Sequence, residues 1–254
     1  DHEVQTRTVV KPGDGDSAIL RLKESSKGLA VSVDGNARFT YLNPYVGGAM
    51  AVAEACRNVA VTGAKPLAIT DCLNFGNPEK PQVYYQLEEC IRGMADACRA
   101  LGIPVISGNV SLYNETAGKS IHPTAIVGAV GVLSDCKNLV NMGFQNVGDS
   151  VFLIGEELQI DESSLAGSEY LSKIHGQESG NPSFNLNKES SLHKFLSEVG
   201  PLGLLNSAHD CSDGGIAVAL SECCIMGALG FKNEGDWFSD RWDTVLYGEL
   251  SSRI

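Results

Sequence analysis

The sequence predicts an α+β fold for its N-terminal part, with helices packed on one face of a β-sheet. Three short strand-like segments come first, over residues 6–10, 17–22 and 28–33. Two helical patterns then alternate with two apolar strand segments, and a loop and a further strand over residues 126–133 follow. This order is typical of a sheet with one helix-covered face.

The third predicted strand leads directly to a carboxylate. Asp34 follows the apolar run that ends at Val33 and precedes Gly35. An acid at a strand end is a candidate metal ligand. Asp-Gly is also typical of a β-turn, and that is the more common role.

A helix is predicted from Pro44 to about Val61. Asn43 is a good N-cap residue, and proline suits the first helical position. The pair Gly47-Gly48 lies in the first turn, where each glycine costs roughly 1 kcal/mol relative to alanine. The pair therefore indicates close packing or an anion near the helix start, and close packing is the more common cause.

A buried strand over residues 67–70 leads to Asp71 and then to an Asn/Gly/Pro loop. A carboxylate directly after an apolar strand is a good ligand for Mg²⁺ or a ribose hydroxyl. A cap or turn role suits the same position equally well, so both interpretations stay open.

The next helix is predicted over residues 81–101, because apolar residues recur there at steps of three and four. They are Val83, Leu87, Ile91, Met94, Cys98 and Leu101. One apolar face of this kind packs against a sheet.

The stretch Ser107–Glu115 follows an apolar strand over residues 101–106 and collects polar side chains. Gly108 allows a sharp turn or close approach to a phosphate. Asn109 offers an amide oxygen suited to Mg²⁺, and Ser111 offers a hydroxyl. Ligands of α/β folds bind where strands end and loops begin, so a binding loop is expected here; a polar turn without a ligand is the alternative.

A domain boundary is expected within the polar segment 135–148, which gives domains over residues 1–146 and 147–254. A helix is predicted over residues 186–199 and another over 216–226. Asp213 is a candidate N-cap of the second helix. Asp210 is a candidate metal ligand at the same helix start, and His209 is expected to be structural because no nucleophile accompanies it in sequence.

Composition excludes several classes of protein. Acidic residues outnumber basic ones 31 to 19, for a net charge of −12, and no basic cluster is present. This argues against a nucleic-acid surface, and a bound nucleotide would need Mg²⁺ or backbone N–H groups to offset repulsion. No run of eighteen apolar residues predicts a membrane span, and the first seven residues do not have the pattern of a signal peptide.

The eight cysteines are expected to be buried, reduced, small apolar residues of a cytoplasmic protein. None forms a Cys-x-x-Cys pair, so the spacing does not favour a metal site. The final residues resemble the beginning of a strand, which suggests a piece of a longer polypeptide.

Three stretches together resemble one family. They are residues 43–48 with residues 63–78, which include Asn74-Phe-Gly-Asn-Pro78; residues 102–115, which include Ser107-Gly-Asn-Val-Ser111; and residues 209–220, which include His209-Asp-Cys-Ser-Asp-Gly-Gly215. They are similar to the second half of formylglycinamidine ribonucleotide synthetase, the large synthetase subunit of purine biosynthesis. The similarity spans nearly the whole chain.

The resemblance implies a covalent pseudo-dimer of two units like aminoimidazole ribonucleotide synthetase. Each unit has an N-terminal α+β domain and a C-terminal α/β domain, and the C-terminal domain would be truncated here. The family reaction is a ligation that converts formylglycinamide ribonucleotide, ATP and glutamine-derived ammonia into the amidine, ADP and phosphate. Phosphoryl transfer of this kind depends on positioning and charge neutralisation and needs no protein nucleophile.

The resemblance also implies residue roles and partners. It implies that Asp71 and Gly108 bind ATP, that Asn109 binds Mg²⁺ and that Ser111 contacts the ribonucleotide; Asp34 and Asp210 are weaker metal candidates. The implied partners are the first half of the same enzyme, a glutaminase subunit and a small accessory subunit. A homodimer of this chain through its N-terminal domain is a further expectation, with no nucleic acid and no membrane involved.

The family's catalytic histidine and its Lys-x-Glu strand end belong to the first half, and here the equivalent strand reads Ser32-Val33-Asp34 without a lysine. The chain alone is therefore expected to be inactive. The alternatives are a non-catalytic nucleotide-holding or pseudo-dimer unit, or another ATP-binding member of the superfamily, such as a selenophosphate or thiamine-phosphate kinase type enzyme.

Overall fold

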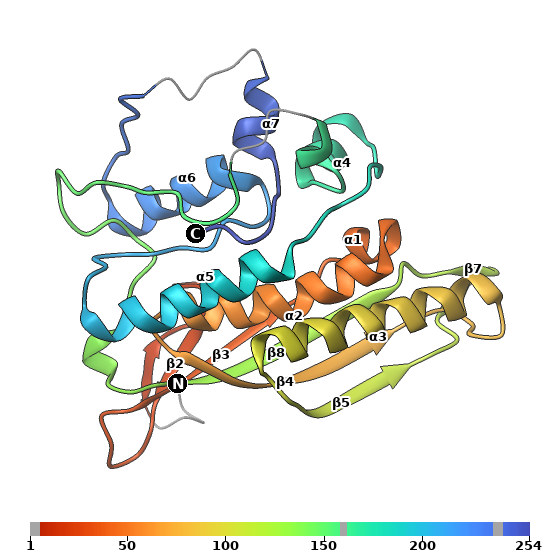
Figure 1. The fold of residues 1–254 in the computed structure, drawn as a ribbon, viewed down its shortest axis with the longest axis horizontal. Helices are drawn as coiled ribbons and strands as arrows, with labels where there is room; N and C mark the ends of the chain where they lie inside the picture. The colour runs from red at the N-terminus through yellow and green to blue at the C-terminus, as the bar shows by residue number, and fades with distance from the viewer. Residues whose placement is uncertain (1–5, 158–161, 236–240) are drawn as a thin grey trace.

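The N-terminal part is a two-layer arrangement of a six-stranded sheet and two long helices in the computed structural model, which describes residues 6–157, 162–235 and 241–254 (Figure 1). The sheet order is β1-β2-β3-β8-β4-β5. Its strands are β1 (Thr8–Val10), β2 (Ala18–Arg21), β3 (Gly28–Asp34), β8 (Thr124–Leu133), β4 (Lys65–Asn74) and β5 (Val105–Ser111). Only β4 and β5 pair in parallel. The predicted α+β sheet with helices on one face is confirmed.

Helices α2 (Pro44–Val61) and α3 (Pro81–Leu101) cover one face of the sheet, and both match their predicted bounds. The Asn43 side chain accepts the Val46 N–H, as expected of an N-cap. A Cβ on Gly48 would overlap the backbone carbonyl of Cys90 in α3. The glycine pair therefore serves close helix packing, the more common of the two interpretations.

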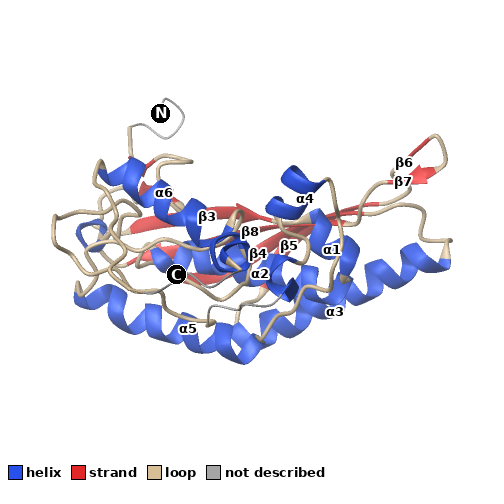
Figure 2. Cartoon of the chain, turned by 90° about the horizontal axis from the view of Figure 1, so that it is seen from above, coloured by secondary structure: helices blue, strands red, loops and turns tan. Residues whose placement is uncertain are grey.

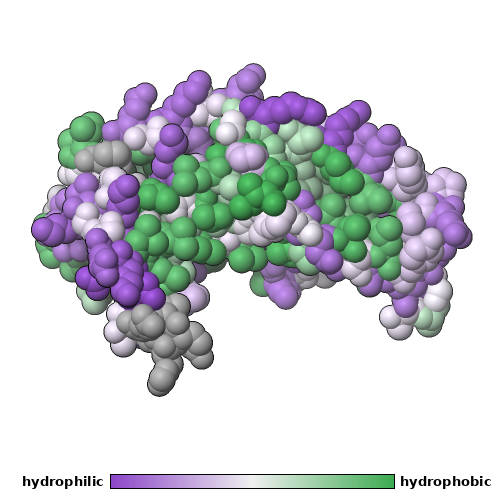
Figure 3. Space-filling model, turned by 90° about the horizontal axis from the view of Figure 1, so that it is seen from below, coloured by the Kyte–Doolittle hydropathy of each residue, from purple (hydrophilic) through white to green (hydrophobic). Residues whose placement is uncertain are grey.

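Alternate residues of the central strand β8 are buried against these helices. Ala125, Val127, Ala129 and Leu133 join the core with Ile69 and Leu73 of β4. No described helix covers the opposite face of the sheet (Figure 1). Val31 and Val33 of β3 are exposed on this open face, and Leu67 of β4 is exposed as well. Figure 3 shows an apolar band across the open face.

Two smaller features of the described N-terminal part were not predicted. Helix α1 (Ala37–Leu42) begins at Asn36, whose side chain accepts the Arg38 and Phe39 N–H groups. Strands β6 (Glu115–Thr116) and β7 (Lys119–Ser120) form a hairpin that projects from one end of the molecule (Figure 2).

The C-terminal part lies over the helical layer. It contains the 3₁₀ turns η2 (Glu162–Leu165) and η3 (Gly200–Leu202) and the helices α4 (Glu169–His175), α5 (Leu186–Val199), α6 (Gly215–Gly227) and α7 (Trp242–Tyr247); a further 3₁₀ turn, η1 (Cys136–Asn138), follows β8. Helix α5 packs on α2 and α3. Among the described residues no helix combines the length and hydrophobicity needed to cross a membrane.

Candidate functional site

The parallel pair β4–β5 carries four of the predicted site residues. Its register places Asp71 opposite Gly108, Cys72 opposite Asn109 and Asn74 opposite Ser111. The expectation that Ser107–Ser111 is already loop was wrong, because β5 pairs with β4 as far as Ser111. Asp71 likewise lies within β4 rather than after it.

Asp71 and Gly108 form one contact on the helix-covered face. A Cβ on Gly108 would overlap the Asp71 carboxylate, so only glycine leaves this carboxylate its position. The backbone N–H of Asn109 donates a hydrogen bond to Asp71, which favours the ionised form, but burial raises the pKa of this carboxyl above its usual value.

Asn109 and Ser111 project from the other face of β5, because side chains alternate along a strand. The Asn109 amide approaches the Cys72 sulfur at 4.0 Å, and one step away Thr70 and Ser107 share a hydrogen bond of 2.7 Å between their hydroxyls. Polar side chains of β4 and β5 thus border the apolar open face. Ser111 and Asn114 bond to each other, with 3.1 Å between the Asn114 amide nitrogen and the Ser111 hydroxyl.

Glu115 belongs to a different contact. Its carboxylate pairs with the Lys80 ammonium at 2.5 Å and accepts the Ser120 hydroxyl at 2.9 Å. The hydrogen bonds to Lys80 and Ser120 lower the pKa of Glu115. Because Ser120 belongs to β7, the same contacts tie the base of the β6–β7 hairpin to Lys80.

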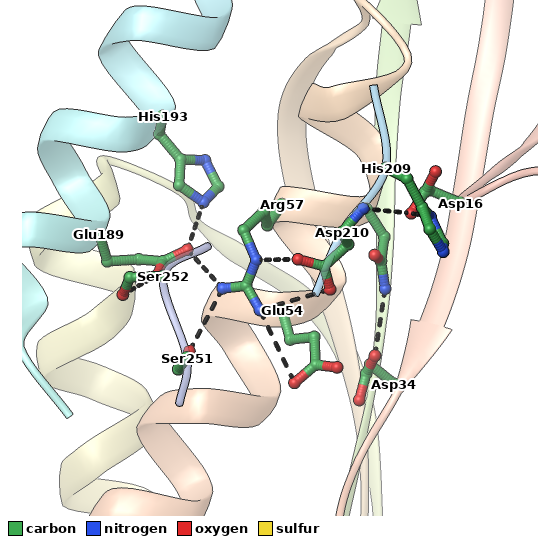
Figure 4. Close-up of polar contacts among 11 residues, drawn as sticks. Asp16, Asp34, Glu54, Arg57, Glu189, His193, His209, Asp210, Ser251 and Ser252 are labelled. Carbon is green, nitrogen blue, oxygen red and sulfur yellow. Dashed lines mark hydrogen bonds and ion pairs between the residues drawn. The ribbon is translucent and has the colours of Figure 1, made fainter. Parts of the chain in front are cut away.

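Asp34 and Asp210 meet at the junction between the N-terminal and C-terminal parts (Figure 4). Asp34 accepts a hydrogen bond of 3.1 Å from the Asn58 side chain. Asp210 accepts two hydrogen bonds from the fully buried guanidinium of Arg57 in α2. The sequence picked out both acids but gave no indication that they are neighbours.

Arg57 connects three segments that lie far apart in sequence. Its Nη1 also donates to Glu189 of α5 at 2.8 Å and to the Ser251 hydroxyl at 3.3 Å. The Glu54 carboxylate lies 3.9 Å from its Nη2. Buried charges persist when each one has partners of this kind.

The junction holds more acids than Arg57 can neutralise. Burial and the nearby Asp210 raise the pKa of Asp34 to about 6. Burial and the neighbouring Asp34 also raise the pKa of Glu54 well above its usual value. In contrast, Arg57 and His193 overcome the effect of burial on Glu189 and lower its pKa to about 2.

His209 also contributes to this junction, because it joins Asp16, which precedes β2, to Glu222 of α6. Its two ring nitrogens lie 2.8 Å from Asp16 and 3.0 Å from Glu222. Burial opposes its charge, but the hydrogen bond to Asp16 dominates and raises the pKa to about 9. The structural role expected for His209 agrees with this placement.

The start of α6 differs from the prediction. The N-cap is Gly214, with φ +80°, and not Asp213. Asp213 instead accepts a hydrogen bond from Asn36 at 3.4 Å. The Gly214 N–H donates to Glu249 at 2.7 Å, so a carboxylate from a distant segment occupies the position of a capping group.

Burial raises the pKa of Glu249 to about 7. One of its oxygens accepts the N–H groups of Gly214 and Glu169, and the other has no hydrogen-bond partner among the described residues. The Glu249 carboxyl therefore holds its proton more readily than an exposed glutamate does.

The metal candidates have different surroundings. No three His, Cys, Asp or Glu side chains in the described part of the chain lie together as a metal site would require. Asp210 is already paired with Arg57. No described residue donates a hydrogen bond to the Asn109 amide oxygen, and the Asn109 amide nitrogen lies 4.0 Å from the Cys72 sulfur. This chain alone therefore offers Mg²⁺ single oxygen donors, not a complete ligand set.

Sequence reasoning missed Arg57 and Glu189 as the centre of the junction. A signal was available for Arg57, because it is the single basic residue between Pro44 and Val61 in an otherwise largely apolar helix. Nothing in the pattern of α5 marks Glu189. All eight cysteines are free thiols, as expected, although Cys72, Cys136 and Cys224 are only half-buried.

Comparison with known proteins places these elements in a family. Residues 14–133 match the model of the AIR synthase related protein, N-terminal domain, and residues 146–241 match that of the C-terminal domain. The chain belongs to the AIR synthase related family. The two-domain fold expected from the resemblance is thereby confirmed.

Two curated members of this family carry the same description, phosphoribosylformylglycinamidine synthase subunit PurL. The relative from Anaeromyxobacter sp. (strain Fw109-5) is 47% identical over 269 residues, and the one from Moorella thermoacetica is 50% identical over 256 residues. Each alignment covers 100% of this chain and 34% of the relative. The chain thus spans about a third of the length of the curated relatives it matches.

Solved structures of Thermotoga maritima PurL also resemble this chain in fold. Thermotoga maritima PurL complexed with ATP has a TM-score of 0.58 and 30% identity, over 78% of this chain and 28% of that chain. The same protein complexed with FGAR has a TM-score of 0.59 and 30% identity, over 78% of this chain and 27% of that chain. AaThiL complexed with AMPPCP and TMP matches at 18% identity with a TM-score of 0.63, over 94% of this chain and 77% of that chain, which shows the shared fold alone.

Proposed function

We propose that this chain is the second synthetase unit of a phosphoribosylformylglycinamidine synthase and provides one side of a composite active site. The full-length ligase would convert formylglycinamide ribonucleotide, ATP and glutamine-derived ammonia into formylglycinamidine ribonucleotide, ADP and phosphate in the cytoplasm. The supporting observation is the β4–β5 pair, which combines a glycine-lined carboxylate on one face with amide and hydroxyl groups on the other. Relatives of the same family are described as PurL and as complexes with ATP and with FGAR.

The proposed residue roles are those that the family resemblance implies. Asp71 and the backbone of Gly108 would contact ATP, and Gly108 would keep the Asp71 carboxylate in position, because a Cβ there would overlap it. The amide oxygen of Asn109 would bind Mg²⁺, and the hydroxyl of Ser111 would contact the ribonucleotide. When bound with ATP, Mg²⁺ supplies neutralisation of the phosphates.

Asp34 and Asp210 have a different proposed role. Asp210 accepts hydrogen bonds from Arg57, and Asp34 accepts one from Asn58. Asp210 would hold the two parts of the chain in a fixed orientation and would therefore be less suited to Mg²⁺ than Asn109. Asp34 would fix α2 against β3 within the N-terminal part.

The open face of the sheet supports pairing with a second unit. Val33 is 69% exposed and Leu67 45% exposed, and a band of apolar residues extends between the strands that carry them (Figure 3). Contiguous exposed apolar surface of this kind is typical of interaction sites. In the full-length enzyme the first synthetase unit would cover this face, and in its absence two copies of this chain would pair through it.

The remaining partners would be a glutaminase subunit that supplies ammonia and a small accessory subunit. A related assembly is described as the structure of PurLQS from Thermotoga maritima, with a TM-score of 0.61 to this chain. The chain alone lacks the first unit, so we expect no phosphate release from ATP with formylglycinamide ribonucleotide and ammonia. Release above background by the purified chain would contradict the composite site.

The decisive experiment compares Asn109→Ala with Asn138→Ala, an exposed asparagine remote from β5, in the full-length protein. Loss of a metal ligand should reduce turnover on the order of 10²-fold and increase the Mg²⁺ concentration required, with an unchanged melting temperature. Asn138→Ala should change neither quantity. A lower melting temperature for Asn109→Ala with unchanged turnover and Mg²⁺ dependence would mean that Asn109 is only structural and would favour a non-catalytic unit.

A further inference from the structure

Asn114 is a polar residue of the segment after β5 that has no part in the residue roles proposed above. It follows the strand by three residues, and its side chain turns back onto Ser111, the last residue of that strand. The Asn114 amide nitrogen lies 3.1 Å from the Ser111 hydroxyl oxygen and 3.0 Å from the Ser111 carbonyl oxygen. The amide oxygen of Asn114 lies 3.3 Å from the same hydroxyl. One side chain thus surrounds the hydroxyl that is the proposed contact to the ribonucleotide.

The turn that brings Asn114 back to Ser111 has an unusual backbone conformation. Tyr113 has a φ of +60°, in the left-handed region that few residues other than glycine adopt. Backbone hydrogen bonds hold this turn against the loop after β4, from Phe75 N–H to the Ser111 carbonyl, from Tyr113 N–H to the Gly76 carbonyl and from Asn114 N–H to the Phe75 carbonyl. Phe75 is fully buried in the core. Backbone strain that the surroundings enforce in this way is typical of segments that hold a ligand.

The orientation of the Asn114 amide follows from two carbonyl groups. Its nitrogen lies 3.1 Å from the Phe75 carbonyl oxygen and 3.0 Å from the Ser111 carbonyl oxygen. Carbonyl oxygens only accept hydrogen bonds, so the reversed amide would place its own oxygen against two acceptors. The nitrogen therefore faces both carbonyl groups, and it is also the amide atom nearer to the Ser111 hydroxyl.

This orientation decides what the Ser111 hydroxyl can do. A hydroxyl has one proton to donate and two lone pairs that accept. When it accepts from the Asn114 nitrogen at 3.1 Å, its own proton remains available for a ligand. Donation of that proton to the Asn114 amide oxygen is the weaker alternative, since it spans 3.3 Å. A phosphate group offers only acceptor oxygens to such a donor.

We propose that Asn114 is a positioning residue that keeps the Ser111 hydroxyl as a hydrogen-bond donor to an acceptor oxygen of the ribonucleotide. The inference rests on the proposed contact between Ser111 and that substrate. Asn114 acts through Ser111 and needs no contact with the substrate, because its amide protons are directed to the Phe75 and Ser111 oxygens.

The test compares Asn114→Asp with Asn114→Ala in the full-length protein. Both variants lose the hydrogen bonds to the two carbonyl groups, but only the aspartate offers acceptors that would capture the Ser111 proton. Asn114→Asp should therefore raise the KM for formylglycinamide ribonucleotide about tenfold, the equivalent of one lost hydrogen bond, and more than Asn114→Ala does. The KM for ATP should not change. Equal effects of the two variants, or a rise in both KM values, would indicate a structural role and would overturn the proposal.

Combination with Ser111→Ala separates capture of the proton from the effect of an added charge. Without the hydroxyl, Asn114→Asp should raise the KM for the ribonucleotide no further. A further rise in the double variant would show that the carboxylate acts directly on the substrate, and it would overturn the proposal. Asn233→Asp is the matched control, because the Asn233 amide also donates to a backbone carbonyl, that of Gly235, at 3.0 Å in the loop after α6. It should leave both KM values unchanged.

Ser111→Ala alone distinguishes this inference from the proposed function. A raised KM for the ribonucleotide in Ser111→Ala, with a wild-type value in Asn114→Asp, would overturn only the role of Asn114. A wild-type KM in Ser111→Ala would remove the proposed substrate contact and this inference with it. If Asn114→Asp does not fold, Asn114→Ala in both backgrounds decides, because effects that add would contradict positioning through Ser111.

Discussion

Asp34 of β3 and Asp71 of β4 pair with the same residue, Val127 of β8, from its two sides. Residues directly opposite each other on antiparallel strands share a face, so both carboxylates lie on the helix-covered face with Val127 between them. Gly108 continues this row on β5. Asp34, Val127, Asp71 and Gly108 are thus neighbours on four adjacent strands, on one face of the sheet.

Gly108→Ala should impair ATP use in the full-length protein. The added methyl group would displace the Asp71 carboxylate, and misplacement of a binding group by about 1 Å can cost on the order of 10²-fold in rate. Steady-state kinetics with varied ATP should show the loss. Gly230→Ala is the matched control, because a Cβ there meets no atom within 4 Å. Wild-type kinetics for Gly108→Ala would exclude the proposed role of Asp71.

Arg57→Met should strongly destabilise the 254-residue chain. It leaves the buried carboxylates of Asp210 and Glu189 without their partner, which typically costs about 3–5 kcal/mol. Arg99→Met removes an arginine that is 74% exposed in its pair with Asp96, and it should cost no more than about 1 kcal/mol. Urea unfolding of both variants measures the difference, and equal losses would show that Arg57 does not hold the junction.

The contribution of His209 to stability should depend on pH. Its pKa in the fold is about 9, above the usual 6.5, so the protonated form stabilises the fold. That contribution is complete below about pH 6.5 and is lost as the pH rises through about 9. The unfolding free energy of His209→Gln should therefore be lower than wild type by about 1–3 kcal/mol at pH 6 and should converge with wild type above pH 9.

His175→Gln is the control for this titration, because His175 is exposed on α4. Its unfolding free energy should follow the wild-type pH profile. A constant difference between His209→Gln and wild type from pH 6 to 10 would show that the His209 charge is irrelevant.

Glu249→Gln should differ from wild type above neutral pH and match it in acid. The pKa of Glu249 in the fold is about 7, above its usual 4.5, so ionisation of this group destabilises the fold. The penalty is absent below about pH 4.5 and grows to its full value above about pH 7. The uncharged variant should thus gain thermal stability relative to wild type at pH 8 but not at pH 4.5. A loss at pH 8 would mean that the ionised carboxylate is the form the fold requires.

Val33→Lys should prevent self-association of the 254-residue chain. Val33 lies on the open face and is 69% exposed, so the lysine costs little in the monomer but introduces charge into a paired surface. Sedimentation at tens of micromolar, a working range for moderate affinities, should show a dimer for wild type and a monomer for the variant. Ile225→Lys, at a 75% exposed site on α6, should remain dimeric. A monomeric wild type would contradict pairing through the open face.

The sequence by itself determined the two long helices and the six sheet strands of the N-terminal part, but not α1 or the β6–β7 hairpin. The bounds of α2 and α3 followed from Asn43-Pro44 and from the spacing of apolar residues around Cys98, because caps and amphipathic periodicity are local properties. The strand ends were less accurate. Asp71 and Ser111 are inside strands, since sheet pairing can extend a strand through polar residues that look like loop in sequence.

Only the tertiary structure decided which side chains meet. Arg57 binds Asp210 and Glu189 across sequence separations of 153 and 132 residues, and no local pattern encodes contacts of that range. The same applies to Glu249, which replaces Asp213 at the start of α6. The placement of Asp71 and Asn109 on opposite faces also required the strand register, because a shift of one residue exchanges the two faces of a strand.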